Sequence, residues 1–377
     1  MASSLNIALQ NQSSSSTVYA YISGLALNNN NAMFLLRADG KTPYFPTSPS
    51  STGTPLAEDC GIPLGTPGTM VTATIPQLAG GRIWFSIGGP LTFLLNPGPA
   101  LVEPSVTNPS DPNIHLAWDF CEFTFNSAQL FANISYVDFV CLPISLTLTN
   151  AAGATQKVSG TGPDGLATVC AGLKAQQATD GVGWDQLIVS STNDQQPLRA
   201  LSPNNAMVMN GSLFSGYYDA YVNDVWTKLA RTSVPVDTQA AWGTLTGQVV
   251  NNKLTFGSVA AFSRPSTADI FSCSTGPFTP SPSPEVGALI ARVSAAFNRS
   301  TLLLDGPAAE SLASYYANPV TNHYARVVHA ANLDAKGYAF PFDDVSPTGG
   351  ADQSGKVEDG APVLLTVAVG GNHASAS

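Results

Sequence analysis

Charged residues are scarce in this chain, and basic ones are the scarcer kind. Only 11% of its 377 residues are Asp, Glu, Lys or Arg, and 25 acidic against 15 basic residues leave a net charge of −10. A surface that binds nucleic acid needs clustered Lys and Arg to pair with phosphates. The composition provides no such basic excess, so nucleic acid is excluded as a partner.

Cysteine is rare as well. The five cysteines are spread singly, with no Cys-x-x-Cys pair and no cluster with histidine of the kind that holds zinc. We therefore expect no metal and no cofactor. Five thiols allow two disulfides and one unpaired cysteine. The candidate pairs are Cys121–Cys141 and Cys170–Cys273, and buried free thiols are the alternative.

No apolar run is long enough to cross a membrane. The longest late run, 361–369, is far shorter than the roughly 20 residues of a spanning helix, so no membrane partner is expected. The start, Met1-Ala-Ser-Ser, lacks the basic and apolar segments of a signal peptide. Asn-x-Ser sequons nevertheless favour a secreted protein whose leader is absent from this chain; they lie at Asn11, Asn133, Asn210 and Asn298.

Glycine and proline are abundant instead, with 33 and 28 residues. They divide the first part of the chain into short segments with strand character. Regularly spaced short strands between turn residues are typical of a β-sandwich or barrel. The clearest segments are Leu5–Leu9, Thr17–Ile22, Ala32–Leu36, Met70–Ile75 and Arg82–Ile87.

The middle of the chain has a different pattern. Apolar residues at helical spacing predict helices over 169–177 and 217–229, and a further helix is expected over 308–316. Ser283-Pro284-Glu285 combines a cap, a first-turn proline and an early acid, which predicts a helix from there to about Phe297. Strands are expected between the helices, at 186–189, 247–250 and 253–256, with a turn at Asn251-Asn252.

Strand character returns at 339–342 and 363–369, while 352–360 is expected to be an exposed loop. The chain is long enough for two domains. We predict a mainly β fold with an α+β insertion, in which 1–165 and 325–377 form a β-sandwich or barrel domain and 166–324 form an inserted α/β domain. An open groove between the domains would suit an extended polymer.

Two segments alternate polar and apolar residues. Trp118-Asp-Phe-Cys-Glu-Phe-Thr-Phe-Asn126 places Glu122 and Thr124 on one face of a strand, and Tyr136-Val-Asp-Phe-Val-Cys-Leu-Pro143 places Asp138 on one face of another. If these strands pair, Glu122 and Asp138 share a polar face. Two carboxyl groups on a rigid sheet are what cleavage of a glycosidic bond requires. An ordinary solvated sheet face gives the same pattern, so that alternative stays open.

Several motifs, in order along the chain, resemble glycoside hydrolase family 64, the β-1,3-glucanases related in fold to thaumatin-like proteins. The resemblance covers most of the chain, and it implies a thaumatin-like β domain. The motifs are Gly81-Arg-Ile-Trp-Phe85, Glu122-Phe-Thr-Phe-Asn126 with a Val-Asp about sixteen residues after the Glu, Asp269-Ile-Phe-Ser-Cys273, and Asn322-His-Tyr-Ala-Arg-Val327 followed by Gly337-Tyr-Ala-Phe-Pro-Phe-Asp-Asp-Val345.

The resemblance also implies roles for individual residues. Glu122 matches the general acid and Asp138 the general base of an inverting reaction. Thr124 and Asn126 match positions that contact the sugar near the cleaved bond.

Aromatic residues are further candidates for substrate binding. Phe131 stands where the family often has a tryptophan that stacks on a sugar ring; phenylalanine keeps a flat apolar face but loses the indole N–H. Tyr136 and Tyr324 are added to the candidate sugar contacts, with core packing as the alternative.

The leading hypothesis is a secreted, endo-acting β-1,3-glucan hydrolase that inverts the anomeric centre and releases short laminarioligosaccharides. Its partner would be a laminarin-type polysaccharide, and we expect a monomer. The rival hypothesis is a non-catalytic, glucan-binding, thaumatin-like wall or defence protein that uses the same groove.

Overall fold

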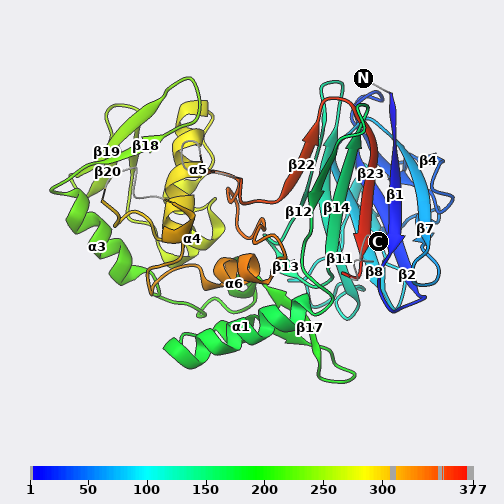
Figure 1. The fold of residues 1–377 in the computed structure, drawn as a ribbon, viewed down its shortest axis with the longest axis horizontal. Helices are drawn as coiled ribbons and strands as arrows, with labels where there is room; N and C mark the ends of the chain where they lie inside the picture. The colour runs from blue at the N-terminus through cyan, green and yellow to red at the C-terminus, as the bar shows by residue number, and fades with distance from the viewer. Residues whose placement is uncertain (1–2, 306–310, 347–349, 351, 372–377) are drawn as a thin grey trace.

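The chain forms a β part and a mixed α/β part, which lie at opposite ends of the molecule's long axis (Figure 1). The structure is a computed structural model that describes residues 3–305, 311–346, 350 and 352–371. The predicted mainly β fold with added helices is confirmed. All six α-helices of the described residues lie between Gly165 and Ala331, and the strands after them return to the β part.

One sheet of the β part has the strand order β15-β14-β23-β1-β7. Its late strand β23 runs parallel to β1 and antiparallel to β14, so it lies between two strands from the first 150 residues. The bounds are β1 Ser4–Asn11, β7 Met70–Pro76, β14 Ile144–Asn150, β15 Thr155–Val158 and β23 Pro362–Val369.

The other large sheet has eight strands in the order β22-β12-β11-β8-β2-β3-β4, with β6 paired to β2. The bounds are β2 Val18–Ala26, β3 Ala32–Leu36, β4 Pro43–Tyr44, β6 Ile62–Pro63, β8 Leu78–Ile87, β11 Ala117–Phe125, β12 Leu130–Ile134 and β22 Lys356–Asp359. A small sheet, β10-β9-β5, joins Ala100–Val102, Leu94–Asn96 and Thr54–Pro55.

Apolar side chains on alternate positions of both sheets form the core of the β part. Ile7 and Leu365 come from one sheet, and Ile83 and Phe125 come from the other; none of them has any exposed surface. Period-two alternation is what lets one face of a strand pack inward while the other stays polar. The other face of the eight-stranded sheet is mixed: Trp84, Trp118 and Phe120 are buried on it, and Arg82 and Glu122 follow on the same strands.

The mixed part contains the helices and two further sheets. Strands β13, β17 and β16 form one (Phe139–Val140, Pro197–Leu201, Ile188–Ser190), and β18 to β21 form the other (Val234–Asp237, Thr244–Val250, Lys253–Phe256, Ala260–Phe262). The helices are α1 Gly165–Asp180, α2 Pro203–Met209, α3 Asp219–Leu229, α4 Thr267–Ser272, α5 Pro284–Asn298 and α6 His323–Ala331.

Several local predictions for this part are confirmed. Helix α5 begins where expected, because the Ser283 hydroxyl accepts a hydrogen bond from the backbone N–H of Val286. Asn251 and Asn252 both have positive φ, as a tight turn between β19 and β20 requires. The expected helix over 308–316 extends over residues outside the described ones; the part that is described holds a short 3-10 helix, Leu312–Ser314.

Other local predictions are wrong. The segment 339–342 forms turns instead of a strand, and 352–360, expected as a loop, contains β22, which pairs with β12. The segment 186–189 begins as a 3-10 helix. The expected division at residues 165 and 325 stays a prediction, and helix α6 runs across its second boundary.

Cysteines and sequons also differ from expectation. All five cysteines are buried free thiols, so neither expected disulfide is present. Three of the four sequon asparagines are buried, and Asn210 alone is exposed. The sequons therefore give less support to secretion than their number implied.

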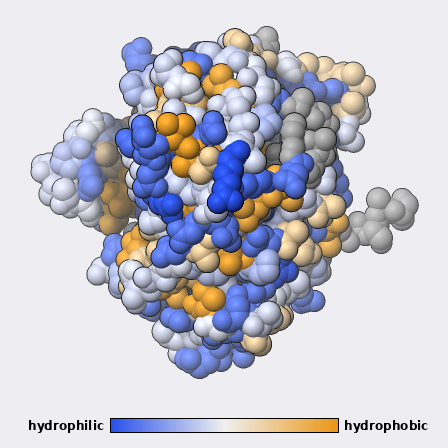
Figure 2. Space-filling model, turned by 90° about the vertical axis from the view of Figure 1, so that its left-hand side faces the viewer, coloured by the Kyte–Doolittle hydropathy of each residue, from blue (hydrophilic) through white to orange (hydrophobic). Residues whose placement is uncertain are grey.

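The outer surface of the mixed part is predominantly polar. Seen from its side of the molecule, apolar residues occur in small groups among polar ones (Figure 2). Within the described residues, no helix has the length and apolar character to cross a bilayer.

Candidate functional site

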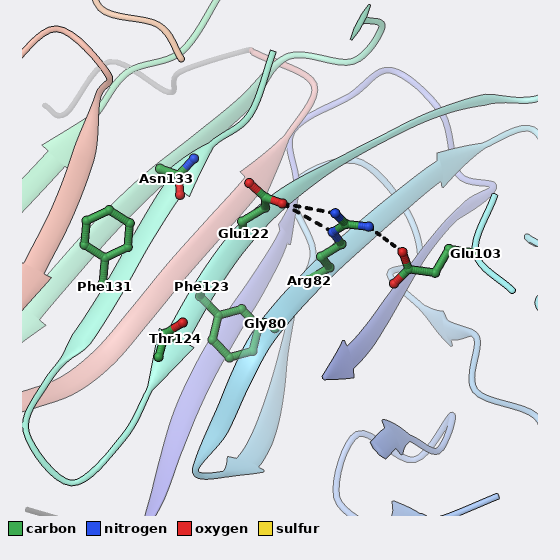
Figure 3. Close-up of a pocket in the computed structure, with 9 residues that line it drawn as sticks. Gly80, Arg82, Glu103, Glu122, Phe123, Thr124, Phe131 and Asn133 are labelled. Atoms are coloured by element: carbon green, nitrogen blue, oxygen red, sulfur yellow. Dashed lines mark hydrogen bonds and ion pairs between the residues drawn. The ribbon is translucent and has the colours of Figure 1, made fainter. Parts of the chain in front are cut away.

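A polar cavity of about 440 Å³ opens on the eight-stranded sheet (Figure 3). This is within the range of small-molecule binding sites. Charged and polar side chains dominate its lining, and two aromatic rings and two glycines complete it. The lining residues are Gly80, Gly81, Arg82, Glu103, Glu122, Phe123, Thr124, Phe131 and Asn133.

Strand register explains why these residues meet. On β11, Glu122 lies opposite Arg82 of β8 and opposite Asn133 of β12, while Thr124 lies opposite Phe131. Residues directly opposite each other in a sheet project from the same face. The alternation of β11 predicted this face correctly.

The other phase of β11 is buried, which fixes the strand in place. Cys121 and Phe125 have no exposed surface, and Phe123 has 2%. A β-bulge in β8 then opens space beside Thr124. Its Gly80 has φ +53°, and a Cβ there would meet nothing within 4 Å.

A single arginine connects two carboxylates in the cavity. The Nε and Nη2 of Arg82 each donate to Glu122 Oε1 at 3.3 Å, and its Nη1 donates to Glu103 Oε2. The three side chains are about a third exposed (31% to 33%). Burial raises the pKa of Glu103 above its usual value, the charge of Arg82 opposes that shift, and the charge of Glu122 adds to it.

Aromatic rings support the guanidinium from beneath. The Arg82 carbon Cζ lies 4.9 Å from the ring centre of Phe120 and 5.5 Å from that of Trp84. Such cation–π contacts stabilise the position of the charge. Arg82 is therefore held from three sides, by two carboxylates and an aromatic floor.

Asp138 is outside this cavity lining. It is half-buried in the bend between β12 and β13, and in space it lies next to the residues that begin α2. Its carbonyl oxygen accepts from the backbone N–H of Ser202 at 2.9 Å, and its Oδ1 accepts from Asn205 Nδ2 at 3.3 Å. The expected strand over Tyr136–Pro143 is wrong, because β12 ends at Ile134 and Asn133 takes the position opposite Glu122.

Two of the expected sugar contacts line the cavity, and a third, Asn126, is not among its lining residues. Thr124 and Phe131 are lining residues. Asn126 is in the turn between β11 and β12, where its Oδ1 accepts from the backbone N–H groups of Ala128 and Gln129. The turn therefore already uses the Asn126 oxygen.

The two expected tyrosines do not reach the sheet surface. Tyr136 is 1% exposed and Tyr324 has no exposed surface. The Tyr324 hydroxyl donates to the carbonyl oxygen of Tyr136, and the Tyr136 hydroxyl donates to Asn332 Oδ1. Their assignment as sugar contacts is thus corrected: both are core residues that join the β part to the α6 segment.

Three polar lining residues, Arg82, Glu103 and Asn133, are not among the site residues that the sequence predicts. In the sequence, Arg82 begins a predicted strand and belongs to a Gly-Arg-Ile-Trp motif, and Asn133 belongs to a sequon, but neither pattern indicates a site. Glu103 follows the three-residue strand β10, which is too short to show any periodicity. The register of β8 against β11 could have indicated Arg82, but nothing local to the sequence indicates Glu103.

The family model described as β-1,3-glucanase, glycoside hydrolase family 64, matches residues 3–369. The chain belongs to this family. This family 64 chain is similar to the crystal structure of a laminaripentaose-producing β-1,3-glucanase in complex with laminaritetraose. The similarity covers 98% of this chain and 99% of the glucanase chain in the crystal structure. The TM-score is 0.85 and the sequence identity 31%.

Named relatives are consistent with this membership. Over 301 residues, the family 64 chain is 32% identical to a glucan endo-1,3-β-glucosidase of Cellulosimicrobium cellulans and 31% identical to one of an Arthrobacter species. The match covers 78% of this chain and 52% of each relative, so the chain spans about half their length. A family 64 glucanase domain from Clostridium beijerinckii, at 22% identity and TM-score 0.75, has the same fold.

Proposed function

We propose that this family 64 chain hydrolyses β-1,3-glucan at internal linkages, with inversion at the anomeric carbon and release of short laminarioligosaccharides. The observation that carries the proposal is Glu122, a carboxylate in an open polar cavity beside the Phe131 ring and the Thr124 and Asn133 side chains. The relatives named as glucan endo-1,3-β-glucosidases support the substrate class.

In the proposed reaction Glu122 is the general acid. Its carboxyl proton passes to the glycosidic oxygen as the bond from that oxygen to the anomeric carbon breaks. Asp138 accepts a proton from a water molecule, whose oxygen bonds to the anomeric carbon from the opposite side. The product has the α configuration, and solvent exchange returns the proton to Glu122 and removes it from Asp138.

A neighbouring amide restrains the proposed base. Asn205 holds Asp138 from the side of α2 at 3.3 Å. An inverting pair is roughly 6.5–9.5 Å apart, which leaves room for the water. The proposal therefore requires a separation in this range between the carboxyl groups of Glu122 and Asp138.

The remaining lining residues would position the polymer. The hydroxyl of Thr124 and the amide of Asn133 can hydrogen-bond sugar hydroxyls, and the ring of Phe131 offers a flat apolar surface to a glucose face. We further propose that the protein acts as a monomer outside the cell, where such polysaccharides are encountered.

The decisive experiment is digestion of a linear β-1,3-glucan with NMR detection of the first anomer released. An initial α-anomer supports hydrolysis and inversion together. An initial β-anomer keeps hydrolysis but makes one carboxylate a nucleophile. Retained binding to the polymer without any product would replace the proposal with a non-catalytic glucan-binding protein.

A further inference from the structure

Arg82 is placed between two carboxylates and pairs with both. It donates two hydrogen bonds to Glu122 and one to Glu103. With both carboxylates ionised, the three side chains carry a net charge of −1. Adding one proton to either glutamate makes the group neutral while Arg82 keeps an ionised partner.

This sharing addresses a difficulty for an acid beside an arginine. A guanidinium stabilises an ionised carboxylate, not the protonated form that a general acid needs. If Glu122 were the sole partner of Arg82, protonating Glu122 would leave the Arg82 side chain, which is about two-thirds buried, without an ionised partner. Because Glu103 keeps Arg82 paired, protonation of Glu122 no longer leaves the guanidinium without an ionised partner.

We propose that Glu103 is a positioning residue that takes over Arg82 whenever Glu122 carries the proton it donates to the substrate. The proposal rests on the proposed function for its catalytic meaning. The exchange of partners itself is a property of the three side chains. In that state the charges of the group balance, because Arg82 and Glu103 are both ionised and the proton is on Glu122.

The other titratable groups near Glu122 do not take the role of Glu103 as a second partner of Arg82. Tyr338 lies beside β12, because it forms a β-bridge with Ser135. Burial is the main reason why the pKa of Tyr338 is raised, and the charge of Glu122 adds to that shift. Lys356 of β22 lies opposite Asn133, one strand farther out, and its Nζ pairs with Glu358 at 2.9 Å. Asp138 hydrogen-bonds Asn205 from outside the lining.

The test is a carboxyl 13C NMR titration of the full chain, with the Glu122 signal assigned by its loss in Glu122→Gln. In Glu103→Gln, Arg82 is left to Glu122 alone, so we expect the Glu122 midpoint to fall by about one unit. In Arg82→Met, which keeps an apolar stem over Phe120, we expect the midpoint to rise by about one unit.

The basic limb of the pH–rate profile should move the same way. At pH values above the basic limb, the rate of hydrolysis by Glu103→Gln should be about tenfold lower than that of the wild type. At lower pH, the plateau rate should be retained. The matched control is Glu58→Gln, which removes the glutamate of another arginine pair in the β part, Arg37–Glu58 at 3.2 Å, outside the cavity. It should leave both the titration and the profile unchanged.

Opposite shifts in the two variants support the proposal. Loss of rate without a shift, or shifts of the same sign, would overturn it and leave Glu103 a structural residue. If the shifts occur but the wild type does not cleave glucan, the proposed function fails while the partner exchange stands. Circular dichroism and thermal unfolding of each variant establish that it is folded.

Discussion

At the scale of single residues, Glu122 combines a rigid backbone with a side chain open to the cavity. Its strand neighbours Cys121 and Phe123 are buried, so the backbone beneath the carboxyl group cannot shift freely. Arg82 restrains the side chain from one side only. This arrangement suits the proposed role of Glu122, in which the carboxyl group stays in place and exchanges a proton with a ligand.

Replacing Glu122 with glutamine should separate catalysis from binding. The amide keeps the size and hydrogen-bonding capacity of the side chain but cannot supply the proton, so we expect hydrolysis to fall by about 10²–10⁴-fold. Release of reducing ends from a soluble β-1,3-glucan measures the rate, and co-sedimentation with insoluble glucan measures binding, which should persist. A fully active variant would remove Glu122 from the role of acid.

The residues of the site differ in how far the sequence predicts them. Glu122 and Thr124 were predictable because a long alternating strand fixes their face, and register explains Phe131. Arg82 and Glu103 were not assigned to the site, since they join it only through strand pairing and an irregular segment. Tyr136 and Tyr324 were misassigned because an aromatic residue near a site motif resembles a core residue in sequence.

At the scale of elements, the hairpin of β11 and β12 carries five of the nine residues that line the cavity. Asn126 closes its turn, with Oδ1 accepting from two backbone N–H groups at 2.8 and 3.0 Å. The backbone N–H of Asn126 also donates to the carbonyl oxygen of Gln129. The turn thus fixes the register that places Glu122 opposite Asn133.

Substitution of Asn126 should therefore act first on stability. We expect Asn126→Ala to lower the free energy of unfolding by about 1 kcal/mol, because two turn donors lose their acceptor. Asn126→Asp keeps the acceptor and should restore stability, as urea unfolding would measure. Because aspartate lacks the Nδ2 donor, weaker binding of laminarioligosaccharides by that variant would show that Asn126 also contacts the sugar.

Element prediction succeeded where one strand or helix carries its own pattern. Strands β1, β2 and β7 and helix α5 were all predictable from local sequence. Strand β22 was not, because its Lys356, Glu358 and Asp359 are typical of a loop and its partner β12 is more than two hundred residues away. The alternation of polar and apolar residues continues past Ile134 in the sequence and predicts a strand there. In the structure the chain bends at Val137 and Asp138 instead.

At the scale of the whole molecule, a buried ion cluster joins the mixed part to the segment that leads back to the β part. Asp343, which has no exposed surface, accepts from Arg299 Nη2 and from His329 Nε2, each at 2.9 Å. Arg299 follows α5, and His329 lies in α6. The cluster therefore holds three segments of the chain together.

This cluster should make stability greatest at mildly acidic pH. Burial opposes the charge on His329, but Asp343 outweighs it and raises the His329 pKa above 6.5; burial likewise opposes ionisation of Asp343, but His329 and Arg299 lower its pKa below 3.8. The His329 contribution is complete below 6.5 and is lost as pH rises through the raised pKa. The Asp343 contribution is present above 3.8 and is lost as pH falls through the lowered pKa.

Urea unfolding at several pH values would measure this window. We expect the wild type to lose stability between about pH 6 and pH 8, and His329→Gln to lose less over the same interval. Asp119 adds a decline of its own, because burial raises its pKa to about 7, so the difference between variant and wild type isolates the histidine. Equal slopes for the two proteins would contradict this account.

The place of β23 in its sheet has a consequence for the order of events during synthesis. Strands β1 and β14 leave the ribosome early, but the position between them is filled only by β23, which is made after the entire mixed part. Until then the growing chain has two unpaired strand edges and an exposed apolar face, the features that attract chaperones or promote aggregation. Apart from β13, the helices and sheets of the mixed part lie together between Gly165 and Ala331, so this part is free to fold while the β part waits for its last strand.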